Sequence, residues 1–517
     1  MRIFKTYFEL HSLTLLIFAL SFVLVSIIFL SFEREKRSVF FLVLASIFIY
    51  AFAATLDPFL NLWDERFHAL VAKNFMNHPF IPTLYDNPIV MMEYDRWDRY
   101  HIWFHKQPLF LWQISLSFKL FGVSEFTLRI PNIVMGVILT FITYRSGKLL
   151  LNYKVGILAG LLLCSSNYLV ELVSGFQGLD HNDFSFLFYV SLSIWAFIEY
   201  TDSKNKKWLY LIGLFSGLAI LCKWLVGLLV YFGWVVIKLK AKNYQLKNYY
   251  DVILALIVTI FVAVPWQLYE FIQFPVEASK EYAFYAEHFK KALEGHTGTW
   301  FYHFELITKI YNVVGALILV PSLILLRSKL NQPKLYWFII ANILVVYAFF
   351  SFAQTKMPSF TIVVFMLVII AIASFCLYVF EQLFNKQHII KSIGFTIFIF
   401  VMILLNMDIE NIQANHTTWK KKYPDRELLI HNRNVFKNLK LQNNTAIFNV
   451  KGRHYIECMF YTDLPSYNFI PSNIQYSDLK SKGYIIAIFQ SDKLNLPEYL
   501  KNDTEVILLS DKILGYE

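Results

Sequence analysis

The stretch that decides the fold is LTLLIFALSFVLVSIIFLSF, residues 13–32, which carries no charged side chain. A helix of this length spans about 30 Å, the thickness of the hydrocarbon core of a bilayer. The run is too long for the apolar part of a cleavable signal peptide, and it leads through EREKR, residues 33–37, into a second apolar run. We therefore expect a membrane anchor here.

Apolar residues dominate much of the remaining chain. Of its 517 residues, 57% are hydrophobic, 18% are aromatic and 16% are charged, which is more apolar surface than a single soluble core buries. Nearly all long apolar runs lie in residues 1–406, whereas residues 407–517 have the composition of a soluble chain. We predict a transmembrane domain over 1–406, with a large first loop at 57–129, and a soluble domain over 407–517.

Apolar runs long enough to cross a membrane, a few with help from flanking residues, begin near Leu13, Val39, Ile130, Val155, Phe184, Trp208, Leu225, Val252, Ile310, Leu335, Phe360 and Ile393. We therefore expect an all-α polytopic membrane protein with about twelve transmembrane helices. Lys and Arg gather in alternate connections, at 34–37, 145–154, 204–207, 238–247, 327–334 and 386–391. The positive-inside rule places these connections in the cytoplasm.

The other connections are then expected outside, at 57–129, 171–183, around Lys223, at 269–309, at 353–359 and after Asn406. The formal charge of +10 is explained by membrane topology, so nucleic-acid binding is not expected. The tail contains short β-like runs, ELLIH, TAIFNV, YIIAIF and EVILL, between helical-looking stretches. This pattern predicts a small C-terminal α/β domain on the outer side.

Two stretches of the first outer loop carry residues suited to chemistry. In LDPFLNLWDERFHALVAKNFM, residues 56–76, Asp64 and Glu65 precede a predicted helix, and carboxylates at such a place can transfer protons. Alternatively, Asp64 caps that helix and Glu65 interacts with its dipole. In FHKQPLFLW, residues 104–112, Lys106 either meets a lipid phosphate or extends to the interface as an ordinary Lys.

Further motifs follow in order: FGVSEFTLRIPN, SGFQGLDHNDF, GLAILCKWLVG, VPWQLYEF with YAEHF, and TKMPSF. Together with the Asp-Glu pair and the Lys-containing aromatic run, this ordered set resembles the lipid-phosphate-sugar glycosyltransferases of the GT-C fold. That family includes the protein O-mannosyltransferases and the aminoarabinose transferases that act on lipid A. The resemblance extends over the whole membrane region.

The resemblance implies a reaction and roles for residues. Asp64 would be the general base and Glu65 would position or tune it, so that a hexose or pentose passes with inversion from a polyprenyl phosphate, undecaprenyl phosphate in a bacterium. The acceptor would be lipid A, another glycan or a protein. Lys106, Arg129 and Lys356 would stabilise the released phosphate. Alternatively, Arg129 anchors a helix start at the interface and Lys356 is an interfacial Lys.

Two further pairs enter through the resemblance. Asp180 matches an acidic position of the family site, and either Asp180 or Asp183 is expected to act there, unless the segment is simply a polar turn. His105 replaces an acid that binds a divalent ion in some members, and His288 lies in the later loop. A zinc or other divalent ion at His105 and His288 is therefore one hypothesis, and an ordinary interfacial His288 is the alternative.

Departures from the family pattern leave the sugar and the acceptor open. The usual Thr-Lys-Gly, for example, reads Cys222, Lys223 and Trp224. The main rival function is a transporter or lipid flippase, but transporters place ionisable residues near the bilayer midplane, and here they collect in outer loops. A silent scaffold has no need of the acidic pair with Lys106. We expect a multi-pass protein of the inner (plasma) membrane, with its active site and tail domain on the periplasmic side and lipids as partners.

Overall fold

A computed structural model describes residues 7–90, 97–176, 180–242, 245–383, 388–419, 423–491 and 495–515. The chain forms two compact units. The first, here the membrane unit, contains Met1–Leu56, Lys106–Phe110 and Arg129–Gln413. The second, here the loop–tail unit, contains Asp57–His105, Leu111–Leu128 and Ala414–Glu517, so most of the first long loop packs with the tail.

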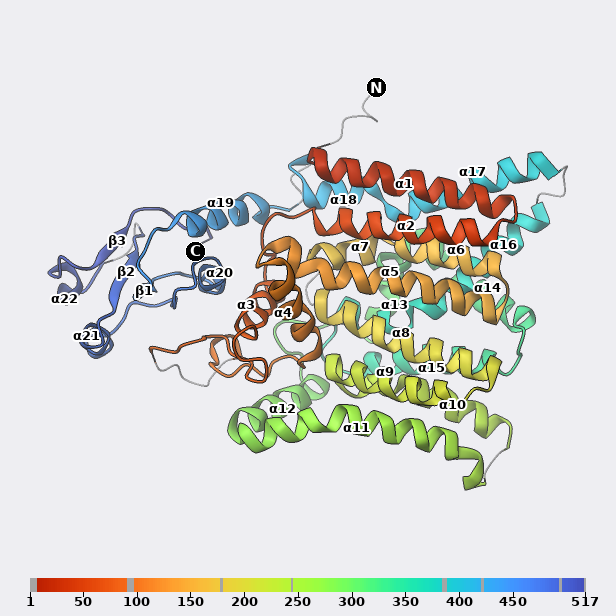
Figure 1. Ribbon diagram of the computed structural model, residues 1–517, viewed down its shortest axis with the longest axis horizontal. Helices are drawn as coiled ribbons and strands as arrows, with labels where there is room; N and C mark the ends of the chain where they lie inside the picture. The colour runs from red at the N-terminus through yellow and green to blue at the C-terminus, as the bar shows by residue number, and fades with distance from the viewer. Residues whose placement is uncertain are drawn as a thin grey trace. The chain divides into compact units, whose positions relative to one another are not determined.

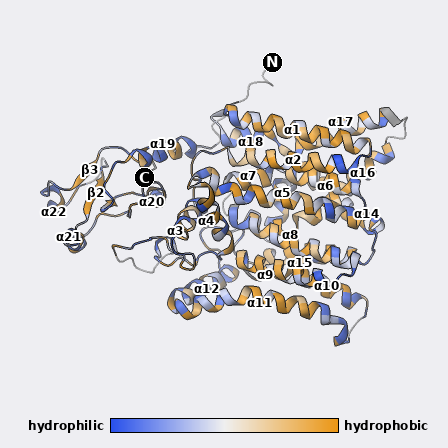
Figure 2. Ribbon diagram, viewed as in Figure 1, coloured by the Kyte–Doolittle hydropathy of each residue, from blue (hydrophilic) through white to orange (hydrophobic). Residues whose placement is uncertain are grey.

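The membrane-associated helices run side by side (Figure 1). Their bounds are α1 (Leu10–Ser31), α2 (Glu35–Ala54), α5 (Glu125–Leu150), α6 (Tyr153–Cys164), α7 (Asn167–Ser174), α8 (Asp180–Ser203), α9 (Lys207–Lys223), η2 (Trp224–Leu228), α10 (Leu229–Lys240), η3 (Leu246–Tyr249), α11 (Tyr250–Gln273), α12 (Pro275–Lys290), α13 (Tyr302–Glu305), α14 (Ile307–Lys329), α15 (Leu335–Phe352), η4 (Pro358–Val364), α16 (Phe365–Leu383), α17 (His388–Met407) and α18 (Ile409–His416). Apolar residues dominate most of these helices (Figure 2). The predicted class, a mostly helical multi-pass membrane protein, is confirmed.

The number of spans is lower than the twelve or so expected. Among the described residues, nine helices are long and apolar enough to cross a membrane, or ten if the bent pair α6 and α7 counts as one span. The runs near Trp208 and Leu225 form α9 and α10, which have 17 and 12 residues. At 1.5 Å per residue these helices measure only about 26 and 18 Å.

Charged residues from the predicted cytoplasmic connections pair with one another in the membrane unit. Lys148 lies 2.5 Å from Glu35, and Arg145 lies 2.6 Å from Glu199. These pairs join the end of α5 to the start of α2 and to the end of α8. Lys386, which belongs to the last basic connection, lies outside the described residues.

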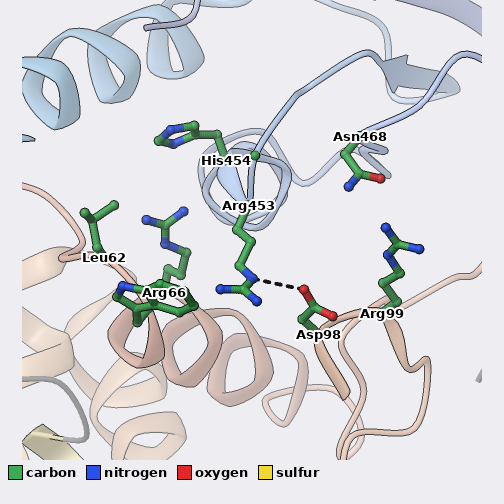
Figure 3. Close-up of a pocket in the computed structure, with 9 residues that line it drawn as sticks. Leu62, Arg66, Asp98, Arg99, Arg453, His454 and Asn468 are labelled. Atoms are coloured by element: carbon green, nitrogen blue, oxygen red, sulfur yellow. Dashed lines mark hydrogen bonds and ion pairs between the residues drawn. The ribbon is translucent and has the colours of Figure 1, made fainter. Parts of the chain in front are cut away.

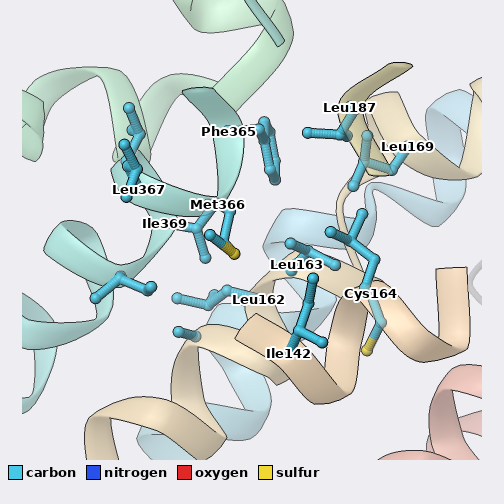
Figure 4. Close-up of a cluster of buried hydrophobic side chains, with 14 of the residues drawn as sticks. Ile142, Leu162, Leu163, Cys164, Leu169, Leu187, Phe365, Met366, Leu367 and Ile369 are labelled. Atoms are coloured by element: carbon cyan, nitrogen blue, oxygen red, sulfur yellow. The ribbon is translucent and has the colours of Figure 1, made fainter. Parts of the chain in front are cut away.

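The core of the membrane unit is continuous and apolar. Side chains from α5, α6, α7, α8 and α16 interlock in it (Figure 4), including Ile142, Leu162, Leu169, Leu187 and Phe365. All five are nearly or fully buried. Dispersion contacts in such a core fix the helix ends that carry the candidate site residues.

The loop–tail unit combines helices with a small sheet. Its elements are α3 (Asp64–Asn74), η1 (Trp97–Arg99), most of α4 (Leu109–Phe121), α19 (Asp425–Asn438), β1 (Thr445–Phe448), α20 (His454–Thr462), α21 (Asn473–Ser481), β2 (Ile485–Phe489), α22 (Glu498–Lys501) and β3 (Ile507–Leu509). The strands are parallel in the order β1-β2-β3, with Thr445 opposite Ile485 and Ala487 opposite Ile507. The predicted small α/β domain is therefore confirmed.

One predicted strand is wrong. The run ELLIH, residues 427–431, lies within α19 rather than in the sheet. The buried residues of α19 are Leu429, Asn432 and Phe436, which are three and four residues apart. This is the spacing of one helix face. The five-residue run ELLIH is too short to show the helical period, so its aliphatic residues resembled those of a strand.

Ion pairs connect the first loop to the tail within the loop–tail unit. Asp57 accepts hydrogen bonds from Arg426 and, over 3.0 Å, interacts with His416 Nδ1. Glu125 lies 2.5 Å from Arg433 Nε. Three carboxylates of the first loop, those of Asp57, Asp98 and Glu125, thus find basic partners more than three hundred positions away in the sequence.

Candidate functional site

Asp64 and Glu65 form the first turn of α3 and are largely removed from solvent. Asp64 is 9% exposed and Glu65 is 1% exposed. A Glu65 carboxylate oxygen accepts a hydrogen bond from the backbone N–H of Asn61 over 2.5 Å. Glu65 is therefore fixed against the backbone of the preceding turn, while Asp64 keeps a small accessible surface.

Backbone conformation sets the direction of this turn. Trp63, which precedes α3 as its N-cap residue, has φ 64° and ψ −121°, a region that residues other than Gly rarely adopt. Trp63 makes no side-chain capping hydrogen bond, and Asp64 is the first residue of the helix rather than its N-cap. A strained residue directly before two buried carboxylates is typical of a functional turn.

Lys106 lies in the membrane unit, half-buried, in the segment before α4. Its neighbour Gln107 is 2% exposed and accepts a hydrogen bond from Gln267 Nε2 over 2.8 Å. The hydroxyl of Tyr282 donates to the Gln267 side-chain oxygen. The C-terminal part of α11 and the helix α12 thus hold the main-chain segment that presents Lys106.

Arg129 has a backbone partner. It lies near the start of α5, is fully buried, and its Nη1 donates to the carbonyl of Ala54 over 3.2 Å. Ala54 is the last residue of α2, whose terminal carbonyls need donors. Arg129 therefore joins the end of α2 to the start of α5.

Lys356 likewise caps a helix end. It is 4% exposed, and its Nζ donates to the carbonyls of Phe350 and Ser351 at 3.0 and 2.6 Å, in the last turn of α15. Burial lowers the pKa of Lys356. Burial, together with the positive charge of Lys356, lowers the pKa of the neighbouring His303 to about 4.

Asp183 is paired with a residue outside the predicted set. It is 2% exposed, in the first turn of α8, and accepts a hydrogen bond from Lys223 Nζ at the end of α9. The same Nζ lies 4.7 Å from the centroid of the Phe360 ring. Asp180 begins α8, and its side chain lies outside the described residues. The helix ends of α8 and α9 and the start of η4 are therefore joined through Lys223.

The two histidines of the metal hypothesis lie in different units. His105 stacks on Trp97, with ring centroids 4.2 Å apart and planes 7° from parallel. His288 Nδ1 lies 3.1 Å from Thr355 Oγ1. The described residues contain no group of three or more His, Cys, Asp or Glu side chains that would hold a metal ion.

Two functional candidates were missed from the sequence. Lys223 stood in a motif of the family pattern, but only the structure pairs it with Asp183. Arg66 follows the Asp-Glu pair directly, is 2% exposed, and lies 3.6 Å from Glu457 of α20. The position of Arg66 directly after Glu65 could have marked it as a candidate in the sequence. Nothing in the sequence indicates that Glu457 is its partner.

Comparisons with known proteins show which sequences resemble this chain. Residues 105–269 match the family described as dolichyl-phosphate-mannose-protein mannosyltransferase. The chain is 26% identical over 283 residues to the undecaprenyl phosphate-alpha-4-amino-4-deoxy-L-arabinose arabinosyl transferase of Pseudomonas aeruginosa, covering 50% of this chain and 47% of the relative. It is 23% identical over 214 residues to an uncharacterized protein of Aquifex aeolicus, covering 40% and 39%. The matches thus span less than half the length of these curated relatives.

Solved structures show the same fold over more of the chain. ArnT from Cupriavidus metallidurans bound to undecaprenyl phosphate superposes with a TM-score of 0.62 at 13% identity, covering 91% of this chain and 89% of that chain. The archaeal oligosaccharyltransferase AglB from Archaeoglobus fulgidus gives a TM-score of 0.52 at 10% identity, covering 84% and 64%. The resemblance is confirmed at the level of the fold: the chain has the GT-C fold of ArnT, and residues 105–269 match the dolichyl-phosphate-mannose-protein mannosyltransferase family.

Proposed function

We propose that the chain is a glycosyltransferase that moves a sugar from a polyprenyl phosphate to an acceptor at the outer face of the membrane. The observation that carries the proposal is the turn with the buried pair Asp64 and Glu65, in a chain whose fold matches ArnT over 91% of its length. That ArnT structure contains undecaprenyl phosphate. We take the same kind of lipid phosphate as the donor.

The reaction assigns one role to each carboxylate. An acceptor oxygen attacks the anomeric carbon while its proton passes to Asp64, and the bond from that carbon to the phosphate oxygen breaks. Attack opposite the leaving group inverts the anomeric carbon, and polyprenyl phosphate departs with the bonding electrons. Glu65, which accepts from the Asn61 N–H, positions the turn rather than taking the proton.

Cations would stabilise the phosphate as it departs. Lys106 is the first choice, because its neighbour Gln107 is anchored to α11 and the Lys side chain is half-buried. Lys356 donates two of its three N–H groups to carbonyls, which leaves one for a phosphate oxygen. Arg129 would act there while also holding Ala54.

The second acidic pair belongs to the membrane unit. Of the two acids Asp180 and Asp183, we favour Asp183 as the positioning residue, because it fixes Lys223 between α8 and α9. The metal hypothesis at His105 and His288 stays a prediction, and no step above depends on it. The outer orientation of the site and the periplasmic tail are likewise part of the proposal, and they rest on the positive-inside rule.

The test is Asp64→Asn with Asp86→Asn as its matched control. Asp86 lies in the same loop with its side chain 46% exposed, so its loss leaves a solvated surface. Transfer from a purified undecaprenyl-phosphate sugar to membrane acceptors should fall at least about a hundredfold in Asp64→Asn. It should stay near wild type in Asp86→Asn, with the same thermal unfolding temperature in both variants.

Retained transfer in a folded Asp64→Asn chain would refute the role of Asp64. The rival function, a flippase, is separated by reconstituting the wild-type chain in vesicles with a labelled polyprenyl-phosphate sugar. Movement of that lipid without any transfer to an acceptor would overturn the enzyme proposal. Mass spectrometry of lipid that co-purifies with the chain identifies the sugar donor.

A further inference from the structure

The loop–tail unit contains a cavity of about 450 Å³ that none of the roles above uses. Its lining comes from the turn before α3, from η1 and from the segment around the start of α20, and consists of Leu62, Trp63, Arg66, Asp98, Arg99, Gly452, Arg453, His454 and Asn468. Figure 3 shows Arg66 and Arg99 extending from the first loop and Arg453 extending between them from the tail. The cavity is thus built jointly by the loop and the tail.

The cavity is strongly basic. Three arginines line it and one aspartate accompanies them. Arg453 Nε lies 2.9 Å from Asp98 Oδ2, and the Arg453 guanidinium lies 4.2 Å from the centroid of the Trp63 ring. A second ring, that of Trp97, has its centroid 5.7 Å from the same guanidinium. One ion pair and two cation–π contacts therefore hold Arg453 in place, and its Nη donors are left for a ligand.

Arg66 indicates what kind of ligand fits. Its side chain is almost fully buried, and its nearest charged partner, Glu457, is 3.6 Å away, which is too long for a hydrogen bond. Its Nε is buried without a hydrogen-bond partner among the described residues. A buried guanidinium donor without an acceptor is costly, so an oxyanion between Arg66 and Arg453 would complete the site.

The size and remaining lining favour a sugar that carries the oxyanion. A volume of about 450 Å³ lies within the range of small-molecule sites and exceeds the need of a bare phosphate. Trp63 offers an indole, 56% exposed, and Asn468 offers an amide for hydroxyl groups. An anionic saccharide uses every part of this lining.

The cavity also has a meaningful position along the chain. Leu62 and Trp63 directly precede Asp64 and Glu65, and Arg66 directly follows them. We infer that this cavity is the acceptor site and binds an anionic saccharide, a sugar ring bearing a phosphate or a carboxylate, beside the base Asp64. The inference rests on the proposed transferase function and adds the acceptor class and the contribution of the tail.

Binding is tested on the full chain in detergent by isothermal titration calorimetry with glucose 1-phosphate, glucuronate and glucose. Wild type should bind both anionic sugars, and glucose at least about tenfold more weakly. Arg66→Gln and Arg453→Gln should each weaken the anionic sugars about tenfold or more. The matched control Arg433→Gln removes an ion-paired arginine of the same unit outside the cavity, and should bind as wild type does.

Arg453→Lys tests whether weaker binding could result from unfolding. A lysine keeps a cation beside Asp98 but lacks the planar guanidinium that binds an oxyanion through two N–H groups. It should unfold at the wild-type temperature and still bind the anionic sugars several-fold more weakly. Equal binding in wild type, Arg66→Gln and Arg453→Lys would overturn the inference. So would equal affinity for glucose and the anionic sugars.

Two further arms separate this inference from the proposed function and from donor binding. Asp64→Asn should bind glucose 1-phosphate with wild-type affinity although it fails to transfer. Wild type that binds the anionic sugars but never transfers would refute the transferase function and leave the site standing. Displacement of glucose 1-phosphate by undecaprenyl phosphate would assign the cavity to the donor and overturn the acceptor role.

Discussion

Charged side chains inside the membrane unit are held by particular partners. Lys356 and Arg129 donate to helix-end carbonyls, and Asp183 accepts from Lys223. A buried charge without a partner is far less stable than the pair, so each contact restricts where its residue can act. The candidate cations are therefore positioned before any substrate binds.

The pair Asp183 and Lys223 gives a test at the scale of the residue. Lys223→Met should lower the free energy of unfolding by about 3 kcal/mol, because Asp183 is left buried with no cation. Asp183→Asn with Lys223→Met should recover most of that loss. Lys291→Met is the matched control, since Lys291 and Glu287 form a pair with 65% and 46% exposed side chains, and it should cost under about 1 kcal/mol. Thermal unfolding in detergent measures the stability of the three variants. Equal losses in Lys223→Met and Lys291→Met would show that the buried ion pair is not especially stabilising.

His303 makes stability depend on pH. Its pKa is about 4 in the folded chain and about 6.5 when unfolded, so the unfolded chain binds more protons between these values. Stability should therefore fall as the pH drops from about 7 towards 4, by about 2 kcal/mol at pH 5. His303→Phe fills the same space between aromatic rings and should remove that part of the pH dependence. Unfolding temperatures at pH 7 and 5 test this, and an unchanged difference between wild type and variant would rule it out.

At the scale of the element, helix ends decide how the loop–tail unit is assembled. Helix α20 packs against α3, and it ends at Asp463, which has φ 61° and ψ 13°. Lys73 of α3 reaches this end, with its Nζ 2.5 Å from Asp463 and 2.6 Å from the carbonyl of Phe460. The left-handed residue at the end of α20 therefore helps to place the helix that carries Asp64.

Two substitutions at Asp463 separate backbone shape from charge. Both Asp463→Gly and Asp463→Ala remove the carboxylate, whose side chain is 76% exposed and contributes little. Only Ala is strained at a positive φ, so Asp463→Ala should be less stable than Asp463→Gly by about 1 kcal/mol. Amide hydrogen exchange along α20 measures the difference. Equal exchange rates in the two variants would show that the turn does not limit the stability of α20.

Individual elements were predictable where the sequence pattern was long or flanked by clear turns. The run at 13–32 could only be a long apolar helix, and TAIFNV and YIIAIF supply β1 and β2 because aliphatic β-formers stand between polar turns. ELLIH failed because its helical face becomes visible only when Phe436 is included. Local periodicity thus predicted the type of element best in the longer runs.

At the scale of the whole molecule, the candidate site depends on long-range contacts that periodicity does not encode. Asp64, Glu65 and Lys106 were identified from local motifs and from the family resemblance. The partners of the first loop were not, since nothing in the sequence distinguishes Arg426, Arg433 and Arg453 from the other charged residues of the tail. Charge patterns along a chain show which residues need partners but not which partners they find.

The tail either folds as an independent domain or completes the fold of the first loop. If 407–517 were an independent domain, its removal would leave the first loop intact. In the structure, removing Ala414–Glu517 takes away the basic partners of Asp57, Asp98 and Glu125, and with them α20, against which α3 packs.

We therefore expect a chain ending at Gln413 to insert its helices, to lose hydrogen-exchange protection throughout α3 and to lose transfer altogether. The control is Lys480→Gln in the full chain, which removes an ion pair within the tail, to Asp503 and Glu505, and should leave both properties unchanged. Hydrogen exchange of the α3 amides in detergent, measured by mass spectrometry, tests this prediction. Wild-type protection of α3 in the truncated chain would mean that the first loop folds on the membrane unit alone. The tail would then be an appended domain rather than half of the acceptor site.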